Sequence, residues 1–156
     1  MAISPDNRWV VTGSWDNTAR LWDLSAKDPA ANPIVLRGHD GGITAVAISP
    51  ENRWLVTASG DTTAQLWDLR AKDPAANPVV LRGHKDAVTG VAISADSRWV
   101  VTGSWDKTAR LWLLQVNDLV DLARTILGRN FFPDEWQLYF PGQPYHKTFP
   151  DLPGPD

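Results

Sequence analysis

The feature that most constrains the fold of this chain is an internal repeat of 45 residues. The interval separates three tryptophans, Trp22, Trp67 and Trp112, and it also separates His39 from His84. The segment RWVVTGSWDNTARLWDL begins at residue 8 and returns with few changes at residues 53 and 98. A repeat unit of this length cannot bury its apolar face alone, so successive units must stack on one another.

Each copy of the repeat predicts short β-strands. In the second copy the apolar, β-forming runs are 43–48, 54–58, 64–69 and 79–81. Turn-forming clusters such as Pro50-Glu51-Asn52 and Ser59-Gly60-Asp61 separate them. None of these runs is long enough for a helix or shows an apolar stripe of 3.6-residue period. The sequence therefore predicts a mainly β chain built from four-stranded units.

The landmarks of the repeat identify a family resemblance. Gly38-His39, Gly83-His84, Trp22-Asp23 and Trp67-Asp68, at this spacing, resemble those of WD-repeat β-propellers. The resemblance covers residues 1–114 and implies repeats near 1–37, 38–82 and 83–114. Repeats this alike also resemble the C-terminal repeats and tail of large bacterial WD-repeat proteins.

The resemblance implies a buried, hydrogen-bonded relay of His, Thr, Asp and Trp in each blade. Its members would be His39, Thr57, Asp61 and Trp67, then His84, Thr102, Asp106 and Trp112, and in the first copy Thr12, Asp16 and Trp22 without a histidine. A buried indole N–H needs an acceptor, and an imidazole can join a carboxylate to a hydroxyl. Because the set recurs with the repeat, it indicates a structural device rather than the single nucleophile of a hydrolase. We therefore expect no enzyme activity.

Metal or cofactor binding is likewise not expected. His39 and His84 belong to different blades, and the chain has no cysteine to complete a zinc site.

The resemblance also implies an interaction surface on the loops at one side of the blades. The candidate partner-binding residues are Trp15, Gly60, Trp105, Gly42, Thr44, Ala87 and Thr89. Trp15 and Trp105 lie in Ser-Trp-Asp turns, where each indole either anchors a partner or packs on the neighbouring blade's loop. Trp9, Trp54 and Trp99 begin strands and are expected to pack, with the preceding arginines solvated or stacked on a ring.

The chain contains under three blades, whereas propellers have about 4–8. Three interpretations follow, in this order: it is the C-terminal end of a longer protein, it forms a ring by self-association, or it stands open with its tail covering one end. Leu113 replaces the aspartate that follows the earlier tryptophans, which suggests that the third copy is the last.

Residues 115–156 differ from the repeats and predict a short α-helical tail that ends in a Pro-rich segment. A helix is predicted over 117–128, a second short helix from Pro133, and extended chain from residue 141. The apolar stripe of the first helix would cover the last blade's outer edge, or meet a partner helix or another copy.

Composition narrows the partners. A formal charge of −3 argues against binding to nucleic acid or anionic membranes. The N-terminus has no secretory signal, no apolar run reaches about 18 residues, and the absence of cysteine is compatible with the cytoplasm. We expect a cytoplasmic scaffold for protein–protein interaction, part of a larger bacterial WD-repeat protein, whose partners are other proteins or further propeller blades. The alternative is a structural unit without a separate ligand, which either assembles with copies of itself into a homo-oligomer or caps a propeller.

Overall fold

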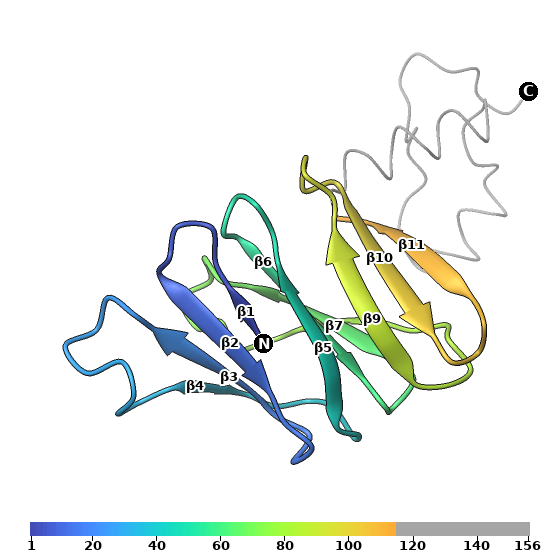
Figure 1. Ribbon diagram of the computed structural model, residues 1–156, viewed down its shortest axis with the longest axis horizontal. Helices are drawn as coiled ribbons and strands as arrows, with labels where there is room; N and C mark the ends of the chain where they lie inside the picture. The colour runs from blue at the N-terminus through green and yellow to red at the C-terminus, as the bar shows by residue number, and fades with distance from the viewer. Residues whose placement is uncertain (115–156) are drawn as a thin grey trace, which may run out of the picture. The chain divides into compact units, whose positions relative to one another are not determined.

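The computed structural model describes residues 1–114, in which eleven β-strands form three antiparallel sheets that lie side by side (Figure 1). Blade 1 contains β1 (Ala2–Ile3), β2 (Trp9–Gly13), β3 (Ala19–Asp23) and β4 (Ile34–Leu36). Blade 2 contains β5 (Ile43–Ile48), β6 (Trp54–Ser59), β7 (Ala64–Asp68) and β8 (Val79–Leu81). Blade 3 contains β9 (Val88–Ile93), β10 (Trp99–Ser104) and β11 (Ala109–Leu113).

Each blade is a meander in which strands consecutive in sequence are hydrogen-bonded neighbours. The apolar runs predicted in the second copy are the strands β5 to β8, and the part of the chain that the structure describes contains no helix. The prediction of an all-β array of partial propeller blades is thus confirmed for residues 1–114. The predicted helices over 117–128 and from Pro133, and the extended segment from 141, lie outside the described residues.

Two apolar clusters hold the blades together. One joins blade 1 to blade 2 and includes Val11, Leu21, Leu55 and Trp67. The other joins blade 2 to blade 3 and includes Val56, Leu66 and Val100, with Trp112 packed against it. Successive side chains of a strand point to opposite faces of the sheet, so Leu55 meets blade 1 while Val56 meets blade 3. Blade 2 therefore buries both of its faces.

Polar contacts of the inner strands reinforce the junctions. The backbone N–H of Ile43 in β5 donates to the carbonyl of Ser14 in blade 1 at 2.9 Å. The hydroxyl of Thr44 donates to the carbonyl of Val88 in blade 3. Adjacent blades are therefore positioned by directional bonds as well as by apolar packing.

Candidate interaction surface and structural relay

The predicted relay residues of blade 2 form one continuous hydrogen-bonded chain. His39 places Nδ1 2.8 Å from Asp61 Oδ2 and Nε2 2.8 Å from Thr57 Oγ1, and the indole N–H of Trp67 donates to the same Thr57 oxygen at 3.0 Å. A neutral imidazole satisfies this geometry when Nδ1–H donates to the carboxylate and Nε2 accepts the threonine proton. Each of these four groups then has a partner, which is the condition for such a network to stabilise a core.

Blade 3 repeats the arrangement almost without change. His84 lies 2.9 Å from Asp106 and 2.8 Å from Thr102, and Trp112 donates to Thr102 at 3.0 Å.

Blade 1 keeps only part of the relay. Trp22 Nε1 donates to Thr12 Oγ1 at 3.2 Å, and the carboxylate of Asp16 pairs with Arg20 at 3.4 Å. In blade 1 the exposed guanidinium of Arg20 therefore contacts the Asp16 oxygen whose counterpart in the other two blades contacts a histidine.

The relay aspartates are held in their ionised form. For Asp61, burial is the largest single influence on the pKa and by itself would raise it. The hydrogen bonds from Thr63, His39 and the N–H of Asp40 together outweigh burial, so the pKa of Asp61 is lowered. The pKa of Asp106 is also lowered, chiefly by the hydroxyl of Thr108 and then by the N–H of Lys85. Carboxylates that accept several N–H and O–H bonds behave in this way.

The geometry of the relay fits a role in stabilising the blade better than a catalytic role. Thr57 and Thr102 are fully buried, and each hydroxyl is occupied by an indole and an imidazole. A hydroxyl in that position cannot reach an external substrate. Within residues 1–114 there is also no group of three or more His, Cys, Asp or Glu that could hold a metal ion.

The glycine before each relay histidine has a conformational reason. Gly38 and Gly83 have φ of 149° and 152°, a region that side chains rarely adopt. A Cβ on Gly38 would also lie 2.8 Å from the side chain of Gln65, and one on Gly83 would lie 2.9 Å from that of Arg110. The Gly-His landmark thus combines a backbone requirement with a relay member.

Sequence reasoning missed one recurring pair. Arg8 reaches Asp23 at 3.2 Å and Arg53 reaches Asp68 at 3.1 Å, so the aspartate of each Trp-Asp landmark accepts from the arginine that immediately precedes β2 or β6. Each guanidinium also lies over the indole of the next residue. The distance to the ring centre is 4.7 Å from Arg8 to Trp9 and 4.4 Å from Arg53 to Trp54. The signal was available, because arginine and aspartate stand 15 residues apart in both copies.

The candidate partner-binding residues gather at one end of the blades. Trp15 and Trp105 occupy the β2–β3 and β10–β11 turns and are 85% and 71% exposed. Gly60 takes the same position in blade 2, where its N–H donates to the carbonyl of Gly42 at 3.0 Å. In blade 3 the N–H of Trp105 donates to Ala87 in the same way, at 3.0 Å.

The remaining candidates take part in contacts of the fold. A Cβ on Gly42 would lie 2.6 Å from the ring of Trp15, so that indole rests by one edge on the neighbouring blade while most of it stays exposed. Thr44 bonds to blade 3, and the hydroxyl of Thr89 lies 3.5 Å from the carbonyl of Gly103. Of the seven candidates, Trp15 and Trp105 offer the large apolar surface.

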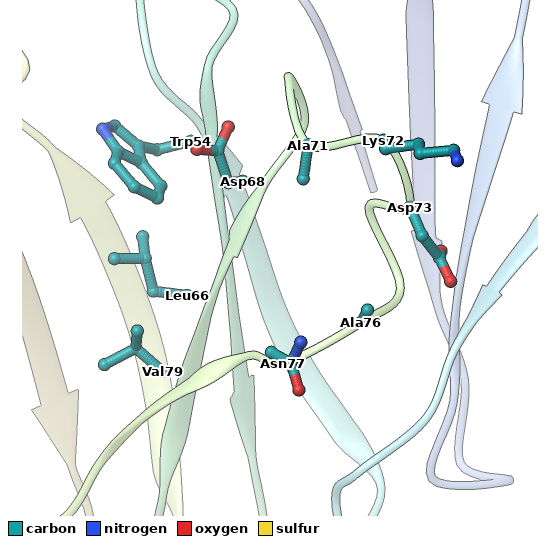
Figure 2. A pocket seen from close by; sticks show the side chains of 9 residues that line it. All are labelled: Trp54, Leu66, Asp68, Ala71, Lys72, Asp73, Ala76, Asn77 and Val79. Atoms are coloured by element: carbon teal, nitrogen blue, oxygen red, sulfur yellow. The ribbon is translucent and has the colours of Figure 1, made fainter.

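A cavity of about 460 Å³ lies beside the β7–β8 linker of blade 2. Figure 2 shows Trp54, Leu66 and Val79 on one side of it and linker residues, among them Lys72 and Asp73, on the other. Its lining contains no histidine and no hydroxyl side chain.

Comparison with known proteins decides the family. The model of the WD domain, G-beta repeat, matches residues 1–23, 32–68 and 77–112, which is more than half of the chain. The chain belongs to the WD40 repeat family. The three matches are offset from the blades by one strand: the first covers β1 to β3, the second begins with β4 of blade 1 and runs to β7, and the third begins with β8 of blade 2 and runs to β11.

The curated relatives of this WD40 chain match only one repeat's length. Denticleless protein homolog A of Xenopus laevis is 41% identical over 46 residues, 30% of this chain and 6% of that protein. Denticleless protein homolog B of the same species is 44% identical over 46 residues, and the Danio rerio homolog is 38% identical over 45. The match spans 6–7% of the length of these relatives.

WD40 repeats of this kind generally mediate protein–protein interaction and typically serve as non-enzymatic scaffolds. Within residues 1–114, no helix is long and apolar enough to cross a membrane.

Proposed function

We propose that this chain is a non-enzymatic scaffold segment that binds another protein through Trp15 and Trp105. The observation that carries the proposal is the exposure of these two indoles at equivalent turns of blades 1 and 3. The other tryptophans of residues 1–114 are buried or half-buried. A large exposed indole on an ordered turn is a favoured interface anchor.

The turns that carry these indoles are well ordered by their own hydrogen bonds. Asp16 accepts from the N–H of Thr18 at 3.0 Å and from its hydroxyl at 2.7 Å. Asp106 accepts from Thr108 in the same way, at 2.9 and 2.6 Å. A rigid turn loses little conformational entropy when a partner binds, which favours affinity.

The cellular setting is part of the proposal. We infer that the protein is cytoplasmic. We also infer that this chain is a segment of a larger bacterial WD-repeat protein, and the near-identity of its repeats supports this second inference. The negative formal charge of −3 supports protein partners over nucleic acid or anionic membranes.

Capture from a bacterial lysate, with identification of what is captured, tests the scaffold proposal. The wild-type chain is compared with a Trp15→Ala, Trp105→Ala double variant, and a Val79→Ala chain serves as control because Val79 is exposed on β8, outside these turns. We expect the double variant to bind the purified partner at least about tenfold more weakly, as loss of an anchor costs above 1 kcal/mol. Equal affinity of all three chains would reject these indoles as the binding site.

A second candidate function is a structural unit that self-assembles or caps a propeller. The observation that favours it is the apolar character of the faces at the two ends of the blade array, in particular the exposed Leu24 and Leu111.

A further inference from the structure

The β2–β3, β6–β7 and β10–β11 turns form a row in which the middle turn carries no side chain. The equivalent positions are Trp15, Gly60 and Trp105, each between a serine and an aspartate. The two indoles are 85% and 71% exposed, and Gly60 is exposed as well. In this row, the turn of the central blade is therefore the place where no side chain projects.

The fold does not require glycine at this position. Gly60 does not have the positive φ that favours glycine. A Cβ on Gly41 would lie 2.7 Å from the backbone nitrogen of Asp61, whereas a Cβ on Gly60 would meet only the carbonyl oxygen of Gly42, at the ordinary distance of 3.9 Å. Neither the backbone conformation nor crowding explains why the side chain is missing here.

The loop that faces this turn differs between the two blade junctions. At the first junction, a Cβ on Gly42 would lie 2.6 Å from the ring of Trp15, so the indole can rest there because residue 42 is glycine. At the second junction the equivalent residue is Ala87, which carries a Cβ. An indole at position 60 cannot take the place that Trp15 takes, and its ring would project over the row instead.

The loops at this end of the blades hold an excess of negative charge. They contain five aspartates and two lysines, a balance equal to the formal charge of −3 of the whole chain. The segments are 14–17, 40–42, 60–62, 85–87 and 105–107. Asp16, Asp61 and Asp106 are ionised, because hydrogen bonds lower the pKa of each. A surface of one sign attracts a partner of the opposite sign.

The molecule itself shows which cationic side chain suits an indole beside a carboxylate. Arg8 lies over the ring of Trp9 and pairs with Asp23, and the same arrangement recurs in blade 2. A planar guanidinium stacks on an aromatic face and also pairs with a carboxylate. Trp15 and Trp105 are each followed directly by an aspartate, so they offer both of these groups to a ligand.

We infer that the partner in the proposed function presents an extended, arginine-containing segment that crosses the blade 2 turn from Trp15 to Trp105, with its main chain over Gly60. The inference rests on that proposed function. Stacked sheets lie about 10 Å apart, so the outer two turns are about 20 Å apart, which about six residues of extended chain span at about 3.3 Å each. The bare turn at Gly60 lets that main chain approach closely.

The test uses a fluorescently labelled peptide of six residues in which arginine and serine alternate. In an extended chain its arginines all lie on one side. A second peptide carries glutamate in place of arginine. Fluorescence polarisation gives the Kd of each peptide for the wild-type chain and for Gly60→Trp. Circular dichroism checks the fold, which should persist because Ser-Trp-Asp turns already occur in blades 1 and 3.

We expect the wild-type chain to bind the arginine peptide at least about tenfold more tightly than the glutamate peptide. Gly60→Trp should weaken binding of the arginine peptide at least about tenfold, because the indole occupies the path of the main chain. Adding Ala87→Gly to Gly60→Trp should restore part of the affinity, because the indole can then rest on residue 87.

Two further variants serve as controls. Lys72→Trp adds the same indole at an exposed position of the β7–β8 linker and should bind like the wild-type chain. Gly60→Lys places a flexible, positively charged side chain on the turn and should also weaken binding, so the test holds even if Gly60→Trp does not fold.

Equal affinity of the wild-type chain for the two peptides, or no binding of the arginine peptide, would overturn the inference. Undiminished binding by Gly60→Trp and Gly60→Lys would also overturn it, as would a failure of Ala87→Gly to restore any affinity. The proposed function is judged separately, by capture of the natural partner with the Trp15→Ala, Trp105→Ala variant. If that variant loses the partner while the Gly60 variants bind normally, the inference fails and the proposed function stands.

Discussion

At the scale of single residues, the threonine at the centre of each relay determines whether three polar groups can be buried together. Thr57 accepts the indole proton of Trp67 and donates to His39, and all three residues are buried. In blade 1, Thr12 accepts from Trp22, and both are only half-buried. The same residue type therefore carries different energetic weight in two copies of one repeat.

Replacing Thr57 with valine keeps the volume and removes the hydroxyl. The indole N–H of Trp67 and Nε2 of His39 lose this partner in a buried site, which costs about 1–3 kcal/mol for each group. Thr12→Val, the matched change in blade 1, should cost less than about 1 kcal/mol because water can reach the half-buried Trp22. Urea denaturation measures both, and an equal loss would contradict the relay's role in stability.

Acid should unfold the chain through its relay carboxylates. The folded-state pKa of Asp61 lies below its ordinary value of 3.8, so the unfolded chain binds protons more readily than the folded one. Stability from this group is complete above about pH 4 and declines as pH falls through the folded pKa. The free energy of unfolding should therefore fall from pH 5 to pH 2.

The matched control for the pH experiment is Asp61→Asn, which cannot titrate. It should be less stable at neutral pH, and its stability should fall less on acidification. Parallel pH curves for the two chains would show that Asp61 does not contribute to the acid sensitivity.

At the scale of elements, the strands and their turns follow from local sequence, while the contacts between blades do not. The runs that became β5 to β8 were predictable because alternation and turn residues act within a few positions. The relay residues were placed by repeat spacing and family resemblance. The bond from Thr44 to Val88 was not predicted, because it depends on which blades become neighbours in space.

Exposure also lay beyond the reach of the sequence. Leu66 and Leu111 occupy the same place in their copies, each directly before a tryptophan, yet Leu66 is buried and Leu111 is exposed. The difference arises from the number of blades stacked on each side. The tail predicted over 117–128 and beyond stays a prediction.

The turn between β6 and β7 contains a strained residue. Thr62 has φ of 71°, and a β-branched side chain in that region costs about 1–2 kcal/mol. Asn17 fills the equivalent place in blade 1 at φ of 68°, and asparagine tolerates it. Thr62→Asn should therefore stabilise the chain by about 1 kcal/mol in thermal or urea unfolding. The reverse change, Asn17→Thr, should destabilise it by a similar amount; a loss of stability in Thr62→Asn would contradict this account.

At the scale of the whole molecule, the residues that stabilise the blade array differ from those that form the proposed binding surface. Blade 2 buries both faces, and the relays of blades 2 and 3 lie inside their sheets. The turns of Trp15 and Trp105 project from one end, where exposed indoles add little to the core. A structural relay and a separate binding surface predict that stability and affinity can be changed independently.

The most direct test of that separation measures partner affinity for two variants side by side, at a temperature where both are folded. The account predicts that Thr57→Val lowers the free energy of unfolding and leaves the affinity unchanged. It predicts that Trp15→Ala, Trp105→Ala lowers the affinity at least about tenfold and leaves the stability unchanged. If Thr57→Val weakened binding in the folded chain, or if the tryptophan variant bound normally, the assignment of structural and binding roles would be wrong.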